Sequence, residues 1–379
     1  MLTHCRQSRL DNSSGGAQTV SVSSSTPPLR LGTRGSDLAL TQSTTVARSL
    51  TAATGREVEL VRIRTEGDRS TASLASLGGT GVFAAALREA LLAGECDIAV
   101  HSLKDLPTAP TPGLSIGALP GRADHRDVLC ARDGLTLAEL PDGARVGTGS
   151  PRRAAQLRLA RPDLTVVDIR GNVGTRLARV GTDLDAVVLA RAGLDRLGLL
   201  ERVTDALDTD VMLPAPGQGA LAVECRTEDL REDALGDPLR QIDHVPTRLA
   251  VLAERAVLRT LEAGCAAPVG AHARLGTGDD GTSVLELSVG VFAPDGSREL
   301  RRSRGVELPG HPERATVIAR GTAKAQDVAL TLAVDLGVGL AEQLLADGAA
   351  EIAGLPAAEP SRAEEGGTVG PAPRPYRSA

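Results

Sequence analysis

A histidine, a serine, a lysine and an aspartate, which together could bind an anion and move protons, fall within residues 101–105. They follow an apolar run, Asp97–Val100, which predicts a short buried strand that ends before these polar residues. Pro107 then fixes the backbone just beyond them. In α/β domains, ligands bind at the loops after the carboxyl ends of strands. Lys104 and Asp105 are therefore candidates for binding and proton transfer.

Lysine is rare in this chain. Only Lys104 and Lys324 are lysines, and the other 40 cationic side chains (42 minus 2) are arginines. A lysine beside an aspartate in such a chain indicates a specific role for the pair. The alternative is that Lys104 and Asp105 form a solvated surface pair, which would contribute little to stability.

One window of the chain is cationic although the net charge is −6. Residues 145–180 hold eight arginines and two aspartates, a local excess of six (8 minus 2). Helix N-termini attract anions, and the planar guanidinium group matches a carboxylate or a phosphate. Arginines that follow strands or open helices therefore predict a site for a multiply charged anion. The candidates here and in the first part of the chain are Arg34, Arg152, Arg153, Arg170 and Arg176, and solvated positions are the alternative for each.

The five cysteines are odd in number, scattered and without a CxxC pair. This pattern favours a reducing compartment and argues against a disulfide framework or a structural zinc site, so no metal site is expected. Cys265 lies in a loop of small residues, where it is either a packing residue or an accessible tethering or nucleophilic thiol. Three others, Cys96, Cys130 and Cys225, lie on or beside apolar strands and are expected in the core.

Composition excludes several classes of protein. Aromatic residues number three in 379, Phe83, Phe292 and Tyr376, so platforms for stacking nucleic-acid bases are not expected. The acidic net charge argues against general polyanion binding. No run approaches the ~20 apolar residues of a membrane span, and the N-terminal residues lack the apolar core of a secretion signal. These features predict a cytoplasmic protein that binds neither nucleic acid nor membrane.

Strand and helix patterns alternate up to about residue 240, which predicts parallel sheets joined by helical crossovers. The predicted strands are 29–32, 58–64, 97–100, 127–131, 144–148, 164–169, 186–190 and 220–225. The predicted helices are 38–53, 82–93, one that starts at Ser150-Pro151, 173–180 and 193–199. The polar, Gly-rich segment 65–81 predicts a mobile binding loop.

After about residue 241 the pattern changes. A long amphipathic helix at 246–262 is followed by antiparallel strands around Val269, Leu285 and Leu300, with a hairpin turn at 294–296. A helical stretch at 312–346 follows. This order predicts a separate α+β unit.

Seven segments occur in a fixed order between Leu29 and Gly354. They are LGTRGSDLALTQS, GGTGVFAAALREALL, DIAVHSLKDLPT, VGTGSPRRAAQL, IRGNVGTRL, PAPGQGALAVECR and LEAGCAAPVG. Together they resemble the hydroxymethylbilane synthase, or porphobilinogen deaminase, family. The resemblance implies two α/β domains like type II periplasmic binding proteins around a central cleft, plus a small α+β C-terminal domain.

We place the domain boundaries from the resemblance and the composition. The first domain comprises residues 29–121 and 214–240, the second residues 122–213 and the third residues 241–354. The polar residues 1–28 and the Pro- and Ala-rich residues 355–379 are predicted to be a disordered extension and tail.

The resemblance also implies an activity. Members of the family join four porphobilinogen molecules head to tail, release ammonia each time and yield linear hydroxymethylbilane for tetrapyrrole and heme biosynthesis. The product grows on a covalent dipyrromethane cofactor, itself made from porphobilinogen and held by a thioether. A monomer is expected.

Roles for individual residues follow from the same resemblance. Cys265 matches the thioether tether, and Asp105 matches the catalytic carboxylate, which would stabilise developing positive charge and shuttle protons. The cofactor-binding matches are Cys265, Ser102, Lys104, Asp105, Ser150, Arg152, Arg153 and Arg176. The substrate-binding matches are Arg34, Ser36, Phe83, Arg170, Arg176, Arg196 and Gln218.

Three places depart from the family pattern: Asp37, Thr80 and Ala266-Ala267. Thr80 leaves open how the loop at 65–81 meets the substrate. Two other functions stay open from the residues alone. One is a non-catalytic two-domain protein that binds or senses a small anion, since fold does not fix function. The other is a hydrolase with Cys265 as nucleophile, which needs a nearby histidine such as His244 or His272.

Overall fold

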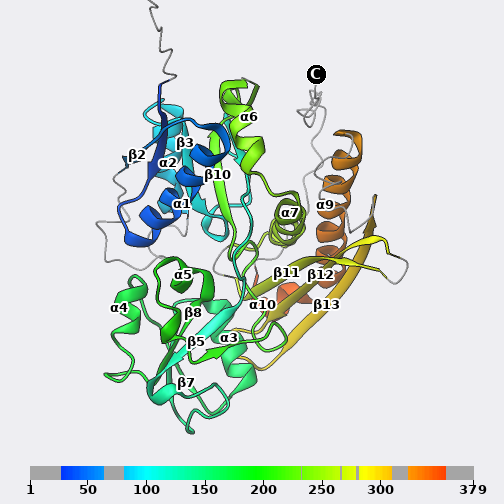
Figure 1. Ribbon diagram of the computed structural model, residues 1–379. Helices are drawn as coiled ribbons and strands as arrows, with labels where there is room; N and C mark the ends of the chain where they lie inside the picture. The colour runs from blue at the N-terminus through cyan, green and yellow to red at the C-terminus, as the bar shows by residue number, and fades with distance from the viewer. Residues whose placement is uncertain are drawn as a thin grey trace, which may run out of the picture.

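The computed structural model describes residues 27–63, 81–231, 233–264, 267–278, 281–309 and 323–355. Within them the chain forms two five-stranded sheets covered by helices on both faces, and a three-stranded sheet beside a pair of long helices (Figure 1). The predicted fold class, two α/β domains plus an α+β domain, is confirmed. Nearly all of the predicted tails and of the loop at 65–81 lie outside the described residues, as does Cys265.

The first sheet has the strand order β2-β1-β3-β10-β4. Alternate residues of its strands pack against helices on opposite faces: Val100 lies in the core beneath α1 and α6, and Ala99 in the core beneath α2. The elements are β1 (Leu29–Thr33), α1 (Asp37–Thr54), β2 (Val58–Arg62), α2 (Gly81–Leu92), β3 (Ile98–Ser102), β4 (Leu114–Ala118), β10 (Leu221–Arg226) and α6 (Asp233–Ile242).

The second sheet repeats this plan with the order β7-β6-β8-β5-β9. Leu157 of α3 packs on one face, and Leu177 of α4 and Leu194 of α5 pack on the other. The elements are β5 (Asp127–Ala131), β6 (Arg145–Gly147), α3 (Pro151–Ala160), β7 (Thr165–Val167), α4 (Val173–Leu177), β8 (Ala186–Ala190), α5 (Arg191–Arg196) and β9 (Asp205–Ala206). Short 3-10 turns lie at Leu103–Asp105, Arg132–Gly134, Leu200–Arg202 and Asp229–Arg231.

The prediction of parallel sheets is confirmed for most strands but not for all. In each sheet one strand is antiparallel to both of its neighbours, β10 in the first and β5 in the second. Each of these strands comes directly after the chain has crossed from the other domain. Such a strand enters its sheet at the edge where the parallel strands end, so it must run in the opposite direction.

The predicted end of the strand at Val100 is also wrong. β3 continues through His101 and Ser102, and both pair with β10. His101 is tolerated in the strand because its buried ring lies next to Glu224 of β10, with Nε2 3.3 Å from Oε2. A polar residue can therefore continue a buried strand when a partner on the neighbouring strand meets it.

Two crossovers, residues 119–126 and 207–220, join the α/β domains and lie side by side. Ala123 N donates to Gly219 O at 3.2 Å, and Arg122 Nε donates to Gln218 O at 2.8 Å. Gly219 has φ +87°, and a Cβ there would lie 2.5 Å from Ala123 O. Only glycine meets both demands, so this position fixes how closely the crossovers approach.

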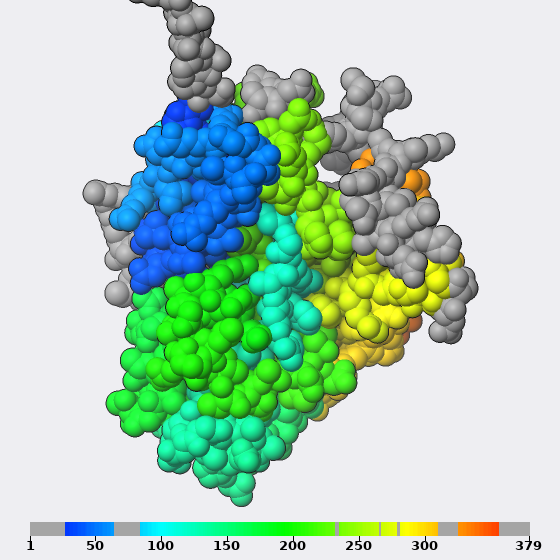
Figure 2. All heavy atoms as spheres, in the orientation of Figure 1, coloured from blue at the N-terminus to red at the C-terminus, as the bar shows by residue number. Residues whose placement is uncertain are grey.

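The third domain packs two long helices against an antiparallel sheet of order β11-β12-β13. Its elements are α7 (Val245–Thr260), β11 (Val269–Thr277), β12 (Ser283–Phe292), β13 (Glu299–Leu308), α9 (Ala323–Ala346) and α10 (Ala349–Ala353). The predicted hairpin turn is confirmed, because Gly296 N donates to Ala293 O at 2.9 Å. In the space-filling view the yellow sheet of this domain adjoins cyan and green residues that come earlier in the chain (Figure 2).

The expectation that no segment is apolar enough to cross a membrane is wrong. Residues Ala325–Ala346 of α9 form a helix that is long and apolar enough by length and composition. One side of this helix is buried in the third domain, with Ala333, Leu336 and Leu340 in the same core cluster as residues of α7 and the sheet. The apolar character of α9 is thus accounted for by packing within the domain.

Candidate active site

A 3-10 turn at the end of β3 carries Lys104 and Asp105. The turn is held by two backbone bonds, Leu103 N to Ala220 O at 3.0 Å and Leu106 N to Leu103 O at 3.1 Å. Leu103 and Leu106 are buried on either side of the two charged residues, whereas Asp105 is exposed. The buried leucines anchor the turn and leave the Asp105 carboxylate facing outward from the sheet edge.

Lys104 lies deeper than its neighbour. Its Nζ is 3.4 Å from Gln218 Oε1, and burial together with the nearby Arg153 lowers the pKa of Lys104 to about 8. The alternative of a solvated surface pair with Asp105 does not describe this environment. A carboxylate bound beside Lys104 would favour its charged form.

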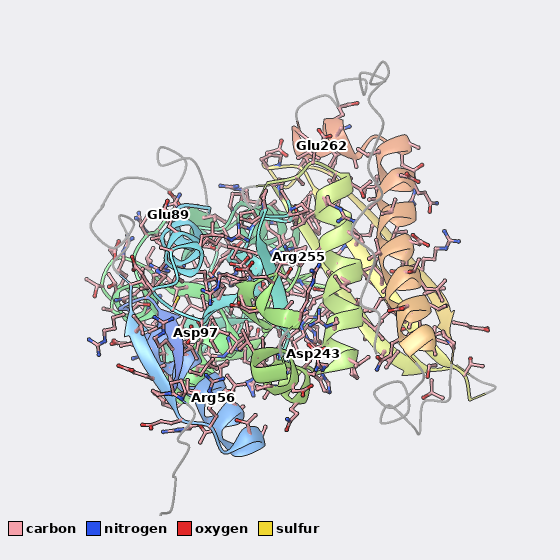
Figure 3. The ribbon with its side chains drawn as sticks, turned by 90° about the horizontal axis from the view of Figure 1, so that it is seen from above. Arg56, Glu89, Asp97, Asp243, Arg255 and Glu262 are labelled. Carbon is pink, nitrogen blue, oxygen red and sulfur yellow. The ribbon has the colours of Figure 1, made fainter. Side chains whose placement is uncertain are left out.

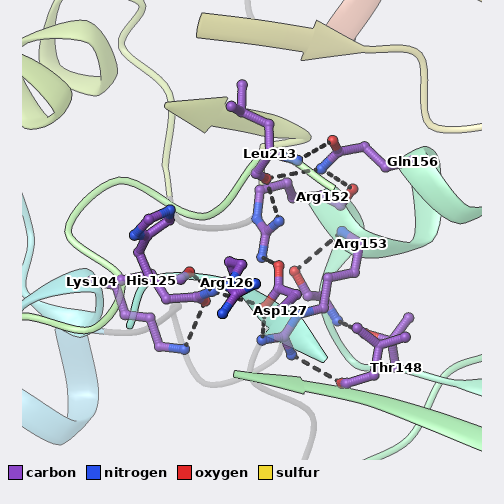
Figure 4. A network of polar contacts seen from close by, with 12 residues as sticks. Lys104, His125, Arg126, Asp127, Thr148, Arg152, Arg153, Gln156 and Leu213 are labelled. Carbon is purple, nitrogen blue, oxygen red and sulfur yellow. Dashed lines mark hydrogen bonds and ion pairs between the residues drawn. The ribbon is translucent and has the colours of Figure 1, made fainter. Parts of the chain in front are cut away.

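The second domain contains a buried cluster built on Asp127 (Figure 4). Its carboxylate accepts from Arg152 Nη2 at 2.7 Å, from Arg153 Nη2 at 2.7 Å and from Gln218 Nε2 at 2.8 Å. Burial opposes the charged form of Asp127, yet the two arginines and Gln218 hold its pKa well below the usual range. Two guanidinium groups share one carboxylate, so the cluster keeps one uncompensated positive charge.

The local sequence places these arginines at a helix start, as predicted. Ser150 is the N-cap of α3, with its Oγ accepting from Arg153 N at 3.5 Å, and Pro151 occupies the first turn. Arg152 Nη1 also donates to Leu213 O at 2.5 Å. Arg152 Nε is buried and has no hydrogen-bond partner among the residues that the structure describes. Such a nitrogen fits a bound anion, because an unpaired buried donor is costly.

Three further arginines of the second domain lie after its strands: Arg170 follows β7, and Arg176 and Arg196 lie in the last turns of α4 and α5. Arg176 Nε donates to Gly171 O at 2.8 Å. Burial, and to a smaller extent the positive charges of Arg153 and Arg170, lower the pKa of Arg176. Arg170 is exposed and pairs weakly with Asp168 at 3.3 Å. Arg196 Nη2 donates to Gly219 O of the second crossover at 2.8 Å, and burial lowers the pKa of this arginine.

The first domain supplies fewer charged side chains to the candidate site. Ser36 is the N-cap of α1, with its Oγ accepting from Ala39 N at 3.4 Å, and Arg34 lies half-buried just after β1. Ser102 Oγ accepts from Gln42 Nε2 at 2.9 Å. Phe83 lies in the first turn of α2, and its side chain is outside the described part of the structure.

The arrangement fits a ligand with several carboxylates. Lys104 and Arg176 are each influenced by nearby charges, and together with those groups they make five cations against three carboxylates, an excess of two (5 minus 3). The cations are Lys104, Arg152, Arg153, Arg170 and Arg176, and the carboxylates are Asp105, Asp127 and Asp168. A dipyrromethane group bearing acetate and propionate side chains matches this donor set.

Not every predicted binding residue is open to a ligand. Gln218 is fully buried, and its amide binds Asp127, His125 O and Lys104. Arg152 and Arg153 are only 4% and 5% exposed. Direct contact of these three residues with cofactor or substrate stays a prediction, as does the role of Cys265, which lies outside the described residues.

Sequence reasoning missed Asp127, the residue that binds both arginines. One signal was available, because Asp127 opens the otherwise apolar run DVLCA and a charge at a buried strand start needs a partner. It also missed Gln42, Arg122 and Glu254. Their partners lie far away in the sequence, so no local pattern marks them.

The remaining cysteines and histidines do not form a second reactive centre among the residues that the structure describes. Cys96, Cys130 and Cys225 are buried as predicted, and burial raises the pKa of their thiols to about 11, 11 and 12. His244 caps the start of α7, about 24 Å along that helix from the segment that leads to Cys265. His272 stacks on His125 with ring centroids 3.7 Å apart.

Comparison with known proteins gives matches over most of the chain. The family model "Porphobilinogen deaminase, dipyromethane cofactor binding domain" matches residues 29–233, and "Porphobilinogen deaminase, C-terminal domain" matches residues 248–346. The porphobilinogen deaminase of Micrococcus luteus is 56% identical over 356 residues, covering 85% of this chain and 93% of the relative. That of Cutibacterium acnes is 57% identical over 346 residues, covering 88% and 99%.

Among solved structures, the methionine-binding protein MetQ aligns with a TM-score of 0.36 and 12% identity, covering 56% of this chain and 89% of MetQ. A periplasmic substrate-binding protein from Coxiella burnetii aligns with a TM-score of 0.36 and 16% identity, covering 60% and 94%. The family assignment therefore depends on the family models and the close relatives, which agree with the cation-rich site. This chain belongs to the porphobilinogen deaminase family.

Proposed function

We propose that this chain is a hydroxymethylbilane synthase, a transferase that condenses four porphobilinogen molecules head to tail in tetrapyrrole and heme biosynthesis. The observation that carries this proposal is the exposed Asp105 carboxylate at the edge of the first domain, opposite the arginines of the second. The negative charge of Asp105 raises the pKa of Arg176 and so partly offsets the lowering by burial. A non-catalytic anion-binding protein would need the arginines but not this carboxylate.

The cofactor would be held by the side chains that match its family site. Cys265 would form the thioether, and Lys104, Arg152, Arg153 and Arg176, with the hydroxyls of Ser102 and Ser150, would bind the acetate and propionate groups. When bound, the dipyrromethane supplies the pyrrole carbon on which the chain of rings is built. The substrate would be bound by Arg34, Ser36, Phe83, Arg170, Arg176, Arg196 and Gln218.

Asp105 would act on the substrate in two steps. When the C–N bond of the aminomethyl group breaks, ammonia leaves with the bonding electrons and the pyrrole ring becomes electron-poor. The Asp105 carboxylate accepts a hydrogen bond from the ring N–H and so stabilises the positive charge. When the new C–C bond to the former aminomethyl carbon has formed, Asp105 can take up the proton that the attacking ring carbon loses.

The same proposal includes the domain boundaries, the cellular location and the oligomeric state. The first domain would comprise residues 29–121 and 214–240, the second 122–213 and the third 241–354. We infer a cytoplasmic monomer that binds neither nucleic acid nor membrane. This inference is supported by the net charge of −6 and by the packing of the most apolar helix, α9, within the third domain.

Intact-mass measurement of the purified chain tests the proposal. The wild-type chain is expected to exceed its sequence mass by one dipyrromethane group and to convert porphobilinogen to hydroxymethylbilane. Cys265→Ser is expected to show the sequence mass alone and no turnover, whereas Cys5→Ser, the matched control, keeps both. A wild-type chain that makes the tetrapyrrole without any covalent adduct at residue 265 would rule out the proposed mechanism.

A further inference from the structure

Arg255, on helix α7 of the third domain, contacts the turn that carries Lys104 and Asp105. Its guanidinium donates three hydrogen bonds to backbone carbonyls: Nη1 to Leu103 O at 3.3 Å, Nη1 to Leu106 O at 2.9 Å and Nη2 to Pro107 O at 2.7 Å. These carbonyls bracket Asp105 on both sides. One planar side chain therefore fixes both ends of the five-residue segment 103–107.

Two of these carbonyls, Leu106 O and Pro107 O, follow the end of the 3-10 turn, where carbonyls lack partners within the turn. The third, Leu103 O, also accepts from Leu106 N at 3.1 Å. A cation at this end is also favoured by the dipole of the turn. Arginine suits the position because its rigid fork can reach several acceptors in one geometry, which a lysine ammonium group cannot do.

Packing on the same face of α7 supports this contact. Val251 lies one helical turn before Arg255 and shares a buried cluster with Leu103 and Leu106. The turn is thus held by apolar contacts to Val251 and by hydrogen bonds to Arg255. Its position relative to α7 is set at two points.

The neighbouring residue ties α7 to the crossovers. Glu254 accepts from Gly217 N at 2.6 Å, from Ala273 N at 2.8 Å and from Arg122 Nη1 at 2.6 Å. Figure 3 shows α7 running from near Asp243 past Arg255 to Glu262, beside the two α/β domains. The helix therefore fixes the Asp105 turn relative to both crossovers, and its end leads within a few residues to Cys265.

We propose that Arg255 is a positioning residue for Asp105, and that the third domain sets the geometry of the catalytic carboxylate as well as carrying the cofactor tether. This inference rests on the proposed function. Arg255 does not touch the reacting atoms. It acts by holding the backbone from which the Asp105 side chain extends, and misplacement of a catalytic group by about 1 Å can cost ~100-fold in rate.

Helix α7 offers a matched control arginine, Arg248. It too is partly buried and reaches the first domain, donating to Gly117 O at 3.3 Å, but it binds Asp243 and does not contact the Asp105 turn. Substitution of either arginine by glutamine removes one interdomain contact of α7. Only Arg255→Gln releases segment 103–107.

The experiment measures kcat, KM, intact mass and thermal unfolding for wild type, Arg255→Gln, Arg255→Lys and Arg248→Gln. We expect kcat of Arg255→Gln to fall about 10- to 100-fold, with KM changed less than about threefold and the covalent adduct retained. Arg255→Lys should lie between Arg255→Gln and wild type. Arg248→Gln should keep kcat within about twofold even where its unfolding temperature falls as far as that of Arg255→Gln.

A double-mutant cycle with Asp105→Glu shows whether Arg255 acts through Asp105. The glutamate variant already displaces the carboxylate, so adding Arg255→Gln should lower kcat much less than it does in wild type. Fully multiplicative effects, or wild-type kcat in Arg255→Gln, would overturn the inference. A wild-type chain that shows neither adduct nor turnover would instead defeat the proposed function, so the two failures are distinguishable.

Discussion

The two α/β domains share one sheet plan but place their charges differently. In both, the antiparallel strand begins opposite the last residue of the central parallel strand: Leu221 pairs with Ser102 in the first sheet, and Asp127 with Ala190 in the second. The equivalent position is thus a buried leucine in one domain and a buried aspartate in the other. The aspartate supplies a buried counter-charge for arginines at this edge, and the leucine does not.

With Asp127 as counter-charge, the second domain buries two arginines at the start of α3. The first domain has only Leu221 at that position, and the helix after its corresponding strand, α1, begins with Asp37 and carries no arginine in its first turn. Its charged candidate residues Lys104 and Asp105 lie instead on the turn 103–105, beside α7. The second domain thus provides cationic groups fixed by Asp127. The first domain presents the Asp105 carboxylate on a turn that α7 binds on its other side.

The largest expected effect is the loss of turnover when the exposed carboxylate, Asp105, is replaced. Asp105→Asn should lower turnover at least about 100-fold, because the amide carries no charge to stabilise the electron-poor ring, while the covalent adduct and thermal stability are kept. Asp133→Asn is the control, since Asp133 is also an exposed aspartate on a short 3-10 turn, the one that follows β5. Steady-state kinetics and intact mass check both. Near-normal turnover of Asp105→Asn would remove this residue from the mechanism.

Asp127→Asn should act on folding rather than on chemistry alone. It leaves two buried guanidinium groups without a carboxylate, and breaking a buried ion pair costs about 3–5 kcal/mol. Urea unfolding should show this loss, and cofactor loading should fall with it. Asp183→Asn breaks only the exposed pair with Arg179 and should cost less than about 0.5 kcal/mol. A loss below 1 kcal/mol for Asp127→Asn would contradict the view that the second domain depends on this carboxylate.

Local patterns in the sequence predicted what depends on local structure. The cap and proline at Ser150-Pro151 predicted the start of α3, and short apolar segments predicted the strands on which both domains are built. Strand direction was predicted wrongly, because β5 and β10 are reversed by the chain crossing between domains. Asp127 and Arg255 were missed for a related reason: their partners lie 25 or more residues away. A long-range partner leaves no periodic signal.

A smaller effect is the pH dependence of the free energy of unfolding that Lys104 causes. Burial and Arg153 lower the folded-state pKa of Lys104 to about 8 from 10.5, so between these values the unfolded chain binds a proton that the folded chain lacks. The free energy of unfolding should therefore rise with pH from about 8 to 10.5. In the cofactor-free Cys265→Ser chain, Lys104→Gln should remove this rise and Lys324→Gln should not. Equal pH dependence in both variants would show that Lys104 is not perturbed.

The smallest effect tests whether the two domains differ in their helix caps. Ser36 and Ser150 cap α1 and α3 at equivalent strand ends, with nearly equal distances of 3.4 and 3.5 Å to their backbone donors. Replacement of either by alanine should cost about 0.5–2 kcal/mol of unfolding free energy, whereas Ser49→Ala within α1 should be close to neutral.

Similar costs for the two caps would place the difference between the domains in the residues that follow, Asp37 in α1 and Arg152 with Arg153 in α3. A much larger cost for Ser150→Ala would mean that this cap also holds the buried arginines in place. The cationic surface of the second domain would then depend on the helix start as well as on Asp127, and the comparison between the domains would no longer reduce to the aspartate alone.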